Sequence, residues 1–392
     1  MTAICHLRPS ALFACVAAIF FATTAKSATL QVGPSQKYSL PSAAISAASD
    51  GDTILVDPAG HYDNDVALIA HNHLTIRSTG PEHVTLKSDG RVYGRKGIWL
   101  FAEHFTDLTI DGFDFSGARV SKADGENGAG LRSQGENLTL THCRFTDNQD
   151  GLLGGGGTTT IEHCEFDHNG STGQTHNVYI NDKDGRLIFR FNYSHDTAIG
   201  HLLKSRSAKN TIAFNRLTDD AGTGSYELDL PNGGECDLIG NIIRQSPRSQ
   251  NSTIIAFGEE GTDTRTLRLS LSHNTIINDK PTGTFIDANK APATLKLISR
   301  NNLFVGPGKQ FAWSAGQVDS AGDLHTTLDR AGFVNSAHGD YHLTSASPAS
   351  GAGVNLTTTP DLIPTFQWLN VNDAAPRLAA ETPDVGAMIV RP

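Results

Sequence analysis

Cysteine is scarce in this chain of 392 residues. Two of its five cysteines, Cys5 and Cys15, lie in an N-terminal segment that we expect to be removed. The other three are too few for a disulfide framework in a chain of this length. No Cys/His spacing is that of a zinc site, and the run 154–157 (Gly-Gly-Gly-Gly) lacks the Lys-Ser/Thr of a phosphate-binding loop. We therefore predict no cofactor from these motifs.

Long apolar runs and excess positive charge are also missing from the body of the chain. No stretch after residue 27 approaches the roughly 20 apolar residues of a membrane span, and the formal net charge is −10. These features argue against a membrane span, a nucleic-acid partner or an anionic membrane surface. The N-terminus has Arg8, a short apolar run over 11–21 and Ala25-Lys-Ser27, which is typical of a secretory signal peptide. We expect residues 1–27 to be that signal, with export to the extracellular space or periplasm.

Internal repetition is the main indication of the fold. Segments of alternating apolar residues recur and share one pattern; they lie at 108–115, 138–145, 159–166, 211–217, 238–243, 269–276 and 297–304. Alternation is typical of strands with one buried face, and fixed-period recurrence is typical of stacked coils. The spacing is longer than the roughly 8–12 residues of a β-sandwich, and no leucine-rich consensus is present.

One position of the repeat forms a column of polar and small residues. Its occupants are Phe113, Cys143, Cys164, Asn192, Asn215, Asn241, Asn274 and Asn302. Stacked Asn side chains can bond along the column and to the turn backbone, which satisfies amides that are costly to bury. We interpret Cys143 and Cys164 as small buried side chains one coil apart, with a disulfide between them as the alternative.

The flanks of the repeat complete the predicted architecture. Ser39 to Ser49 has a Pro near a helix start and an Ala-rich body, followed by an Asp-Gly turn and a β-branched strand. This combination resembles the start of secreted right-handed parallel β-helix proteins of the pectate-lyase-like superfamily, in which a helix caps the first coil. We predict an all-β fold, a single-stranded right-handed parallel β-helix with an N-terminal capping helix. It forms one domain over 28–392, with core coils at about 50–305 and an irregular C-terminal wrap at 306–392.

A candidate site follows from the strand register. Counting back twelve residues from the column places Leu131, Leu152, Ile180 and Leu203 inward, and the next residues outward: Arg132, Leu153, Asn181 and Lys204. With a one-residue shift in the next coil, Glu227 and Asp229 face outward as well. Basic residues are concentrated over 186–216 and acids over 218–237. The basic coil therefore presents Lys204 between an amide and carboxylates. The two adjoining charged patches either form a groove for a charged ligand or neutralise each other on a solvated surface.

The Lys204-Ser205 strand resembles polysaccharide lyase family six, the alginate and chondroitin lyases, over about 199–241. The resemblance implies that Lys204 is the catalytic lysine. The chain departs from that family where an Arg-His-Gly motif is expected, since it reads Leu228-Asp-Leu-Pro-Asn-Gly-Gly234, and Thr197 and Ile199 replace the carboxylates that hold calcium. Calcium therefore does not carry over. A divalent cation stays open, with no site identified.

The residues themselves suit β-elimination at a uronate. This reaction needs a base for the C5 proton, a cation for the carboxylate and an acid for the leaving oxygen. We expect Lys204 to be the base, with its pKa lowered by Arg206 and Lys209, and Arg206 to pair with the carboxylate. The candidate proton donors and further contacts are Tyr179, Tyr226, His201 and His176, with Asn181, Arg132 and Glu259 binding substrate.

Each of these assignments has an alternative interpretation. The alternative for Lys204 is an ion pair with Asp229 or Glu227, and His201 faces inward in this register as a core histidine. A hydrolase would use Glu227 and Asp229, about 6–7 Å apart on one strand face, as an acid/base pair, with Glu259-Glu260 one coil later. An epimerase on the same scaffold is a further alternative. A non-catalytic adhesin would hold sugars on aromatics such as Trp99, Phe101, Tyr179 and Tyr226. In each case we expect a monomer whose partner is a polysaccharide, in the lyase case an acidic one.

Overall fold

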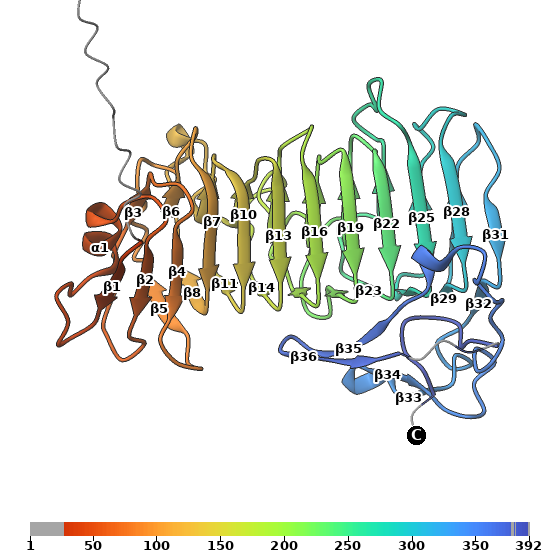
Figure 1. The fold of residues 1–392 in the computed structure, drawn as a ribbon. Coiled ribbons are helices and arrows are strands. Elements are labelled where there is room, and N and C mark those ends of the chain that lie inside the picture. The colour runs from red at the N-terminus through yellow and green to blue at the C-terminus, as the bar shows by residue number, and fades with distance from the viewer. Residues whose placement is uncertain (1–26, 378–379, 381, 391–392) are drawn as a thin grey trace, which may run out of the picture.

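A computed structural model describes residues 27–377, 380 and 382–390. The expected signal peptide at 1–27 lies outside this part except for Ser27. None of the helices in the described ranges has the length and apolar character needed to cross a bilayer. Figure 1 shows the chain winding as a row of parallel strands from one end of the molecule to the other. The predicted right-handed parallel β-helix is confirmed.

Three parallel sheets, named A, B and C here, run the length of the molecule, and successive strands within each sheet come from successive coils. Sheet A is formed by β1 (Thr29–Val32), β2 (Thr53–Val56), β4 (Thr75–Ser78), β7 (Thr106–Asp111), β10 (Glu136–Thr141), β13 (Thr158–Glu162), β16 (Arg186–Arg190), β19 (Lys209–Ala213), β22 (Glu235–Ile239), β25 (Arg268–Ser272), β28 (Lys296–Arg300) and β31 (Asp319–Ala321). Sheet B is formed by β3 (Ala67–Ile69), β6 (Gly97–Phe101), β9 (Ala129–Ser133), β12 (Asp150–Gly154), β15 (Val178–Ile180), β18 (Leu203–Ser205), β21 (Leu228–Leu230), β24 (Thr253–Phe257), β27 (Thr284–Asp287) and β30 (Lys309–Ala312). Sheet C is formed by β5 (Val84–Lys87), β8 (Phe113–Ser116), β11 (Arg144–Thr146), β14 (Glu165–Asp167), β17 (Tyr193–His195), β20 (Arg216–Thr218), β23 (Ile242–Gln245), β26 (Thr275–Asn278), β29 (Leu303–Val305) and β32 (Leu324–Thr326).

The coils therefore extend beyond the predicted limits of 50 and 305 on both sides. The first strand, β1, pairs with β2, and helix α1 (Pro41–Ala47) lies at this end, with Pro41 in its first turn. Ala44 and Ile45 of the helix are buried in the main core. The helix thus covers the open first coil, as a stacked array requires at its ends.

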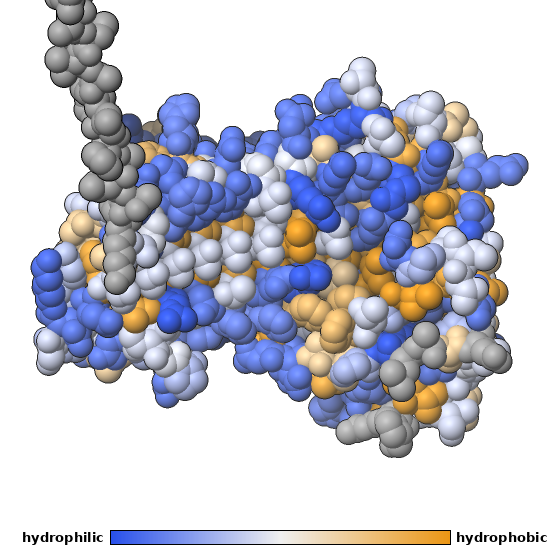
Figure 2. Space-filling model, in the orientation of Figure 1, coloured by the Kyte–Doolittle hydropathy of each residue, from blue (hydrophilic) through white to orange (hydrophobic). Residues whose placement is uncertain are grey.

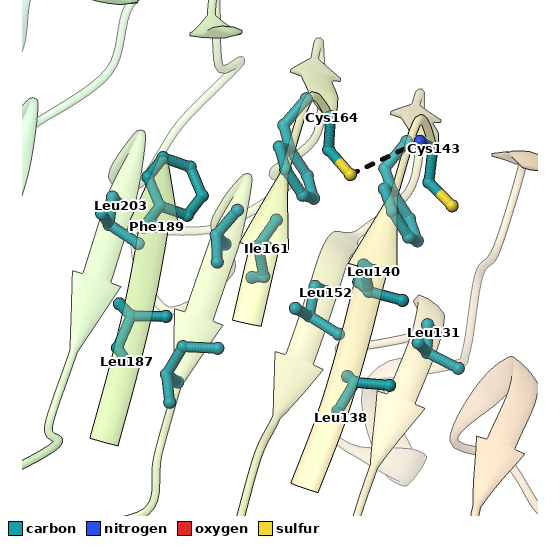
Figure 3. Packing of buried hydrophobic residues seen from close by; sticks show 14 of the residues in the cluster. Leu131, Leu138, Leu140, Cys143, Leu152, Ile161, Cys164, Leu187, Phe189 and Leu203 are labelled. Atoms are coloured by element: carbon teal, nitrogen blue, oxygen red, sulfur yellow. Dashed lines mark hydrogen bonds between the residues drawn. The ribbon is translucent and has the colours of Figure 1, made fainter. Parts of the chain in front are cut away.

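The interior is filled by side chains in register from coil to coil. Figure 3 shows Leu, Ile and Phe side chains of successive coils pointing into the same core. Phe115, Phe145 and Phe166 stack with ring centroids 5.0 Å apart, which matches the strand spacing of about 4.8 Å. Trp99 and Phe101 belong to this core and are fully buried. The suggestion that they hold sugars is therefore wrong.

Sheets A and C meet at a tight two-residue corner. The first residue of the corner has a positive φ in coil after coil, as at His142, His163 and Phe191. The second residue of the corner occupies the predicted polar column. Asn192, Asn215, Asn241, Asn274 and Asn302 form a continuous chain in which each side-chain oxygen accepts the backbone N–H of the preceding Asn. The predicted amide ladder is confirmed.

Cys143 and Cys164 occupy the same column without a disulfide, whereas Cys236 lies in β22. Cys143, Cys164 and Cys236 are free and buried, and the Cys143 N–H donates to Cys164 Sγ at 3.4 Å (Figure 3). The Cys164 N–H donates to Asn192 Oδ1, so that the sulfur positions join the amide ladder. The interpretation of Cys143 and Cys164 as small buried side chains is confirmed.

The C-terminal segment packs against the outer face of sheet C. It contains two hairpins, β33 (Phe333–Asn335) with β34 (Asp340–Leu343) and β35 (Phe366–Asn370) with β36 (Asp373–Pro376), and two short 3-10 turns, η2 (Ser336–His338) and η3 (Pro360–Leu362). A third 3-10 turn, η1 (Lys122–Asp124), lies earlier in the chain, before β9. Tyr341, Leu343 and Trp368 form an apolar cluster with outward residues of sheet C. Figure 2 shows apolar side chains gathered where this segment meets the coils. Sheet C is thus covered here, whereas a long stretch of sheet B is left for a cleft.

Candidate active site

The cleft lies on the outer face of sheet B and has a volume of about 600 Å³. Its floor is one residue from each of five successive strands. Arg132 pairs in register with Leu153, Leu153 with Tyr179, Tyr179 with Lys204, and Lys204 with Asp229. Successive positions of such a column are about 4.8 Å apart. The loop after β24 adds Glu259 and Glu260 at the end nearer the C-terminus.

Ten of the eleven predicted site residues line this cleft; they are Arg132, His176, Tyr179, Asn181, His201, Lys204, Arg206, Tyr226, Asp229 and Glu259. Their order differs from the prediction in one coil. Tyr179, rather than Asn181, is the neighbour of Lys204, and Ile180 pairs with Ser205. The predicted placement of Asn181 in the outward column is therefore wrong, although this exposed residue still lies at the cleft.

Lys204 forms two ion pairs. Its Nζ lies 3.0 Å from Asp229 Oδ2 and 3.0 Å from Glu260 Oε1. Burial lowers the pKa of Lys204, but the two carboxylates outweigh burial and raise it above the usual value. The predicted lowering of this pKa is wrong, because Lys209 lies on sheet A beyond the turn and pairs with Glu235 there. The alternative ion pair with Asp229 is confirmed, and Lys204 is an ammonium at neutral pH.

The donors of Arg206 are also engaged by protein groups. Its Nε donates to Tyr179 Oη at 2.7 Å, Nη1 to Asn232 Oδ1 at 2.7 Å and Nη2 to Glu260 Oε2 at 2.5 Å. Glu260 thus bridges Lys204 and Arg206 with its two oxygens. Burial raises the pKa of Glu260, yet these bonds lower it below the usual value overall. The Glu260 side chain is 46% exposed, so a ligand carboxylate has access to the same two cations.

Asp229 differs from Glu260 in its surroundings. The Asp229 side chain is only 4% exposed, and burial raises its pKa to about 6 despite the ion pair with Lys204. Two carboxylates with opposite pKa shifts therefore contact the same ammonium. The sequence places Glu260 only among the added carboxylates of the hydrolase alternative and does not predict its contact with Lys204. The signal that could have singled it out is the Gly258-Glu-Glu-Gly261 turn directly after an apolar strand.

His176, His201 and Tyr226 form a stack along the cleft wall. Ring centroids are 4.6 Å apart between the two histidines and 4.9 Å apart between His201 and Tyr226. The His201 N–H donates to His176 Nδ1 at 3.0 Å, and the Tyr226 N–H donates to His201 Nδ1 at 3.1 Å. A ring nitrogen that accepts an N–H carries no proton, so both imidazoles are protonated at Nε2.

These histidines are neutral donors. Burial, with the nearby cations, holds the pKa of His176 well below its usual range and lowers the pKa of His201 to about 3. The His201 Nε2 lies 3.5 Å from Asp229 Oδ2. The expectation that His201 faces inward is wrong: it precedes β18 at a corner, where strand alternation does not apply. The next member of the stack, Tyr226, donates its hydroxyl to Glu259 Oε2 at 2.9 Å.

Arg132 has buried donors that no described residue satisfies. Its Nε and Nη1 have no hydrogen-bond partner within the described ranges. Burial lowers the pKa of Arg132, while Asp150 and Tyr179 favour its charge. Asp150 is fully buried, accepts the His176 N–H at 2.8 Å and has its pKa raised to about 8 by burial. Arg132 is a guanidinium at neutral pH and lines the cleft, where it is suited to a carboxylate ligand.

Comparisons with known proteins support the same architecture. The model of the right handed beta helix region matches residues 88–243. The crystal structure of pectate lyase Pel9A matches with a TM-score of 0.63 at 14% identity, over 93% of this chain and 97% of that chain. The chain has the pectate-lyase-like β-helix fold. An alginate lyase from Paenibacillus sp. str. FPU-7 matches with a TM-score of 0.46 at 10% identity, over 74% of this chain and 99% of that chain. No curated protein sequence matches significantly.

One predicted residue lies away from the site of this β-helix. Glu227 is 1% exposed, is absent from the cleft lining and contacts Ser249 Oγ at 3.4 Å and Gln245 Nε2 at 3.3 Å. Burial and the charge of Asp219 raise its pKa well above the usual value. The prediction that it shares an outward face with Asp229 is wrong, because Glu227 precedes the three-residue strand β21 and turns into the interior.

The described residues do not fit a resident calcium ion in the cleft. Asp229 and Glu260 are bonded to Lys204, and Glu259 accepts from Tyr226, so no free set of carboxylates converges there. Within the described ranges, one group has metal-ligand atoms close together: Glu165, Asp167 and His195, on sheet C. Burial opposes charge on His195, but its bonds to Asp196 and Glu165 raise its pKa to about 9.

Proposed function

We propose that this protein is a secreted, monomeric enzyme that cleaves a uronate-containing polysaccharide by β-elimination. The observation that carries the proposal is the Lys204–Glu260–Arg206 arrangement, in which one accessible carboxylate already sits across two cations in a cleft. A uronate carboxylate has the same charge and geometry. The likeness of the fold to a pectate lyase agrees with this substrate class without assigning it.

In the proposed reaction the substrate carboxylate displaces Glu260 and pairs with the Arg206 guanidinium, next to Lys204. This neutralises the carboxylate, which acidifies the C5 proton of the uronate. Lys204, in its neutral form, removes that proton; the C5 electrons form a C4–C5 double bond as the C4–oxygen bond breaks. The Tyr226 hydroxyl protonates the leaving oxygen. Burial and Glu259 raise the pKa of Tyr226, so that it keeps its proton for this step.

The raised pKa of Lys204 has a direct consequence for this mechanism. The neutral amine is present only at high pH, so the rate is expected to rise towards alkaline pH. His201 cannot serve as the acid through an imidazolium, because its pKa is about 3. Its Nε2–H instead holds Asp229 or a sugar oxygen in place. The proposed base, acid and carboxylate site all come from neighbouring coils.

A second candidate is hydrolysis by Asp229 and Glu260. The observation that favours it is their opposite pKa shifts: Asp229, at about 6, would be the proton donor and the ionised Glu260 its partner. This pair replaces Glu227 and Asp229, since Glu227 is buried away from the cleft. The two mechanisms give different products, because hydrolysis forms no double bond.

The test is incubation of the purified protein with a panel of acidic polysaccharides. Elimination is expected to release products with the ultraviolet absorbance of an unsaturated uronate, and Lys204→Ala is expected to lower the rate at least about 1000-fold while the fold is retained by circular dichroism. Lys209→Ala, on sheet A, is the matched control and keeps the activity. Reducing ends without that absorbance contradict elimination and support hydrolysis. Retention of a glycan without cleavage contradicts both.

A further inference from the structure

The charges of the cleft are unevenly distributed along its length. Arg132 lies three coils from Lys204 towards the N-terminus, about 14 Å at the backbone. On the other side of Lys204 the charged side chains of the cleft lining and of the outward column are acidic. Glu259 lines the cleft there, and Asp287 follows Asp229 and Ala256 in the same outward column.

The positive end has an unused binding capacity. The buried Nε and Nη1 of Arg132 have no partner within the described ranges, whereas Lys204 and Arg206 are both paired with carboxylates. Arg132 lines the cleft and forms no ion pair within the described ranges, so its guanidinium is suited to a second acidic group of the ligand. The neighbouring histidines add no charge, because their Nδ1 atoms accept backbone N–H groups.

Among the described residues, no Lys or Arg lines the cleft at its negative end. Glu259 accepts a hydrogen bond from the neutral hydroxyl of Tyr226, and Lys290 Nζ donates to the Glu259 backbone oxygen at 3.1 Å. Asp287 is half-buried, and its Oδ1 accepts the backbone N–H of Asn289, a neutral group, at 2.9 Å. A sugar carboxylate beside these two acids would meet like charge with little compensation.

We infer that the substrate is a heteropolysaccharide in which the sugar next to the cleaved uronate, on the Glu259 and Asp287 side, is uncharged or bears an amine, while a further acidic group binds Arg132. This inference rests on the proposed function, because it takes Lys204 as the reaction centre. It excludes homopolymers of uronate as the preferred substrate. Charge, rather than the shape of the sugar, sets this preference.

The experiment measures binding on the Lys204→Ala variant, so that it does not depend on catalysis. Titration calorimetry compares a uronate homo-oligomer with an oligosaccharide of equal length that alternates uronate and hexosamine. Unit charges about 10 Å apart at an effective dielectric constant of about 20 change a binding constant on the order of tenfold. The alternating ligand is therefore expected to bind about tenfold more tightly.

Added substitutions locate the effect. Glu259→Gln with Asp287→Asn is expected to remove most of the difference by strengthening binding of the homo-oligomer, and Arg132→Ala to weaken both ligands. Glu235→Gln, on sheet A, is the charge-matched control and changes neither. Equal or tighter binding of the homo-oligomer overturns the inference, as does binding of neither ligand. Failure of the proposed function is a separate result, the absence of unsaturated products from any polysaccharide.

Discussion

Replacing Asn241 by Ala tests whether the amide ladder stabilises the coils. Asn241 is fully buried. Its Oδ1 accepts the backbone N–H and the side-chain amide of Asn215 at 3.0 and 2.9 Å, and its Nδ2 donates to Ile212 O at 2.8 Å and to Asn274 Oδ1 at 2.9 Å. Four bonds that join three coils disappear together in this variant.

The cost follows from what is left without a partner. The Asn215 N–H and the Ile212 carbonyl are backbone groups in a dry interior, and each unsatisfied buried group costs about 1–3 kcal/mol. The expected loss of unfolding free energy is therefore about 2–6 kcal/mol, before any cavity term. The matched control is Cys164→Ala in the same column, which removes the weaker 3.4 Å bond from the Cys143 N–H to sulfur and is expected to cost less.

The assay is urea unfolding followed by circular dichroism, with both variants and the parent protein under identical conditions. Asn241→Ala is expected to shift the midpoint to a clearly lower urea concentration than Cys164→Ala does. A loss below about 1 kcal/mol for Asn241→Ala, or a larger loss for Cys164→Ala, would refute the reasoning, because hydrophobic stacking alone would then hold the coils together.

Three further predictions concern ionisation. Glu260→Gln removes one carboxylate from Lys204 and lowers the pKa of Lys204. The rising limb of the pH–rate profile is therefore expected to move to lower pH, with full activity retained. Loss of activity would instead favour Glu260 as a hydrolytic carboxylate. Burial raises the pKa of Asp150 from 3.8 to about 8, so the folded state keeps a proton that the unfolded chain loses, and stability falls as pH rises between those values. Asp150→Asn is expected to remove this pH dependence, worth up to about 5 kcal/mol, in unfolding experiments at pH 4 and 8; an unchanged slope contradicts it. The imidazoles of His176 and His201 are expected to remain Nε2-protonated and not to titrate between about pH 5 and 8 in nitrogen NMR spectra, and a titration in that range contradicts the bonds to Nδ1.

The fold could be predicted because the sequence pattern of the corner between sheets A and C recurs in successive coils. A positive-φ residue followed by Asn or Cys recurs, and apolar and polar residues alternate on both sides of it, as in strands with one buried face. The register in sheet B was harder, because the turns that join sheets B and A differ in length. Five residues, 181–185, separate β15 from β16, but only three, 206–208, separate β18 from β19. Counting back from the Asn column therefore misplaced Asn181 by two residues.

The charge state of Lys204 could be predicted only in part. Asp229, one coil away, is recognisable from the repeat, but Glu260 reaches Lys204 from 56 residues later, out of a loop whose direction no repeat specifies. Lys209 is near in sequence and yet lies on a different sheet, because the chain turns a corner at residues 206–208. Proximity along the chain is thus a poor guide to electrostatics in a coil that changes direction every few residues.

The single outward column of sheet B has a consequence for how such a cleft can change. Arg132, Leu153, Tyr179, Lys204 and Asp229 follow one another along the cleft in the same order as along the chain. Removing one whole coil, such as the 21 residues that lead from the Arg132 position to the Leu153 position, would shorten the distance between Arg132 and Lys204 by one strand spacing, about 4.8 Å. The distance between two recognised groups on a polymer could therefore be altered by the insertion or deletion of a coil, without redesign of either binding group.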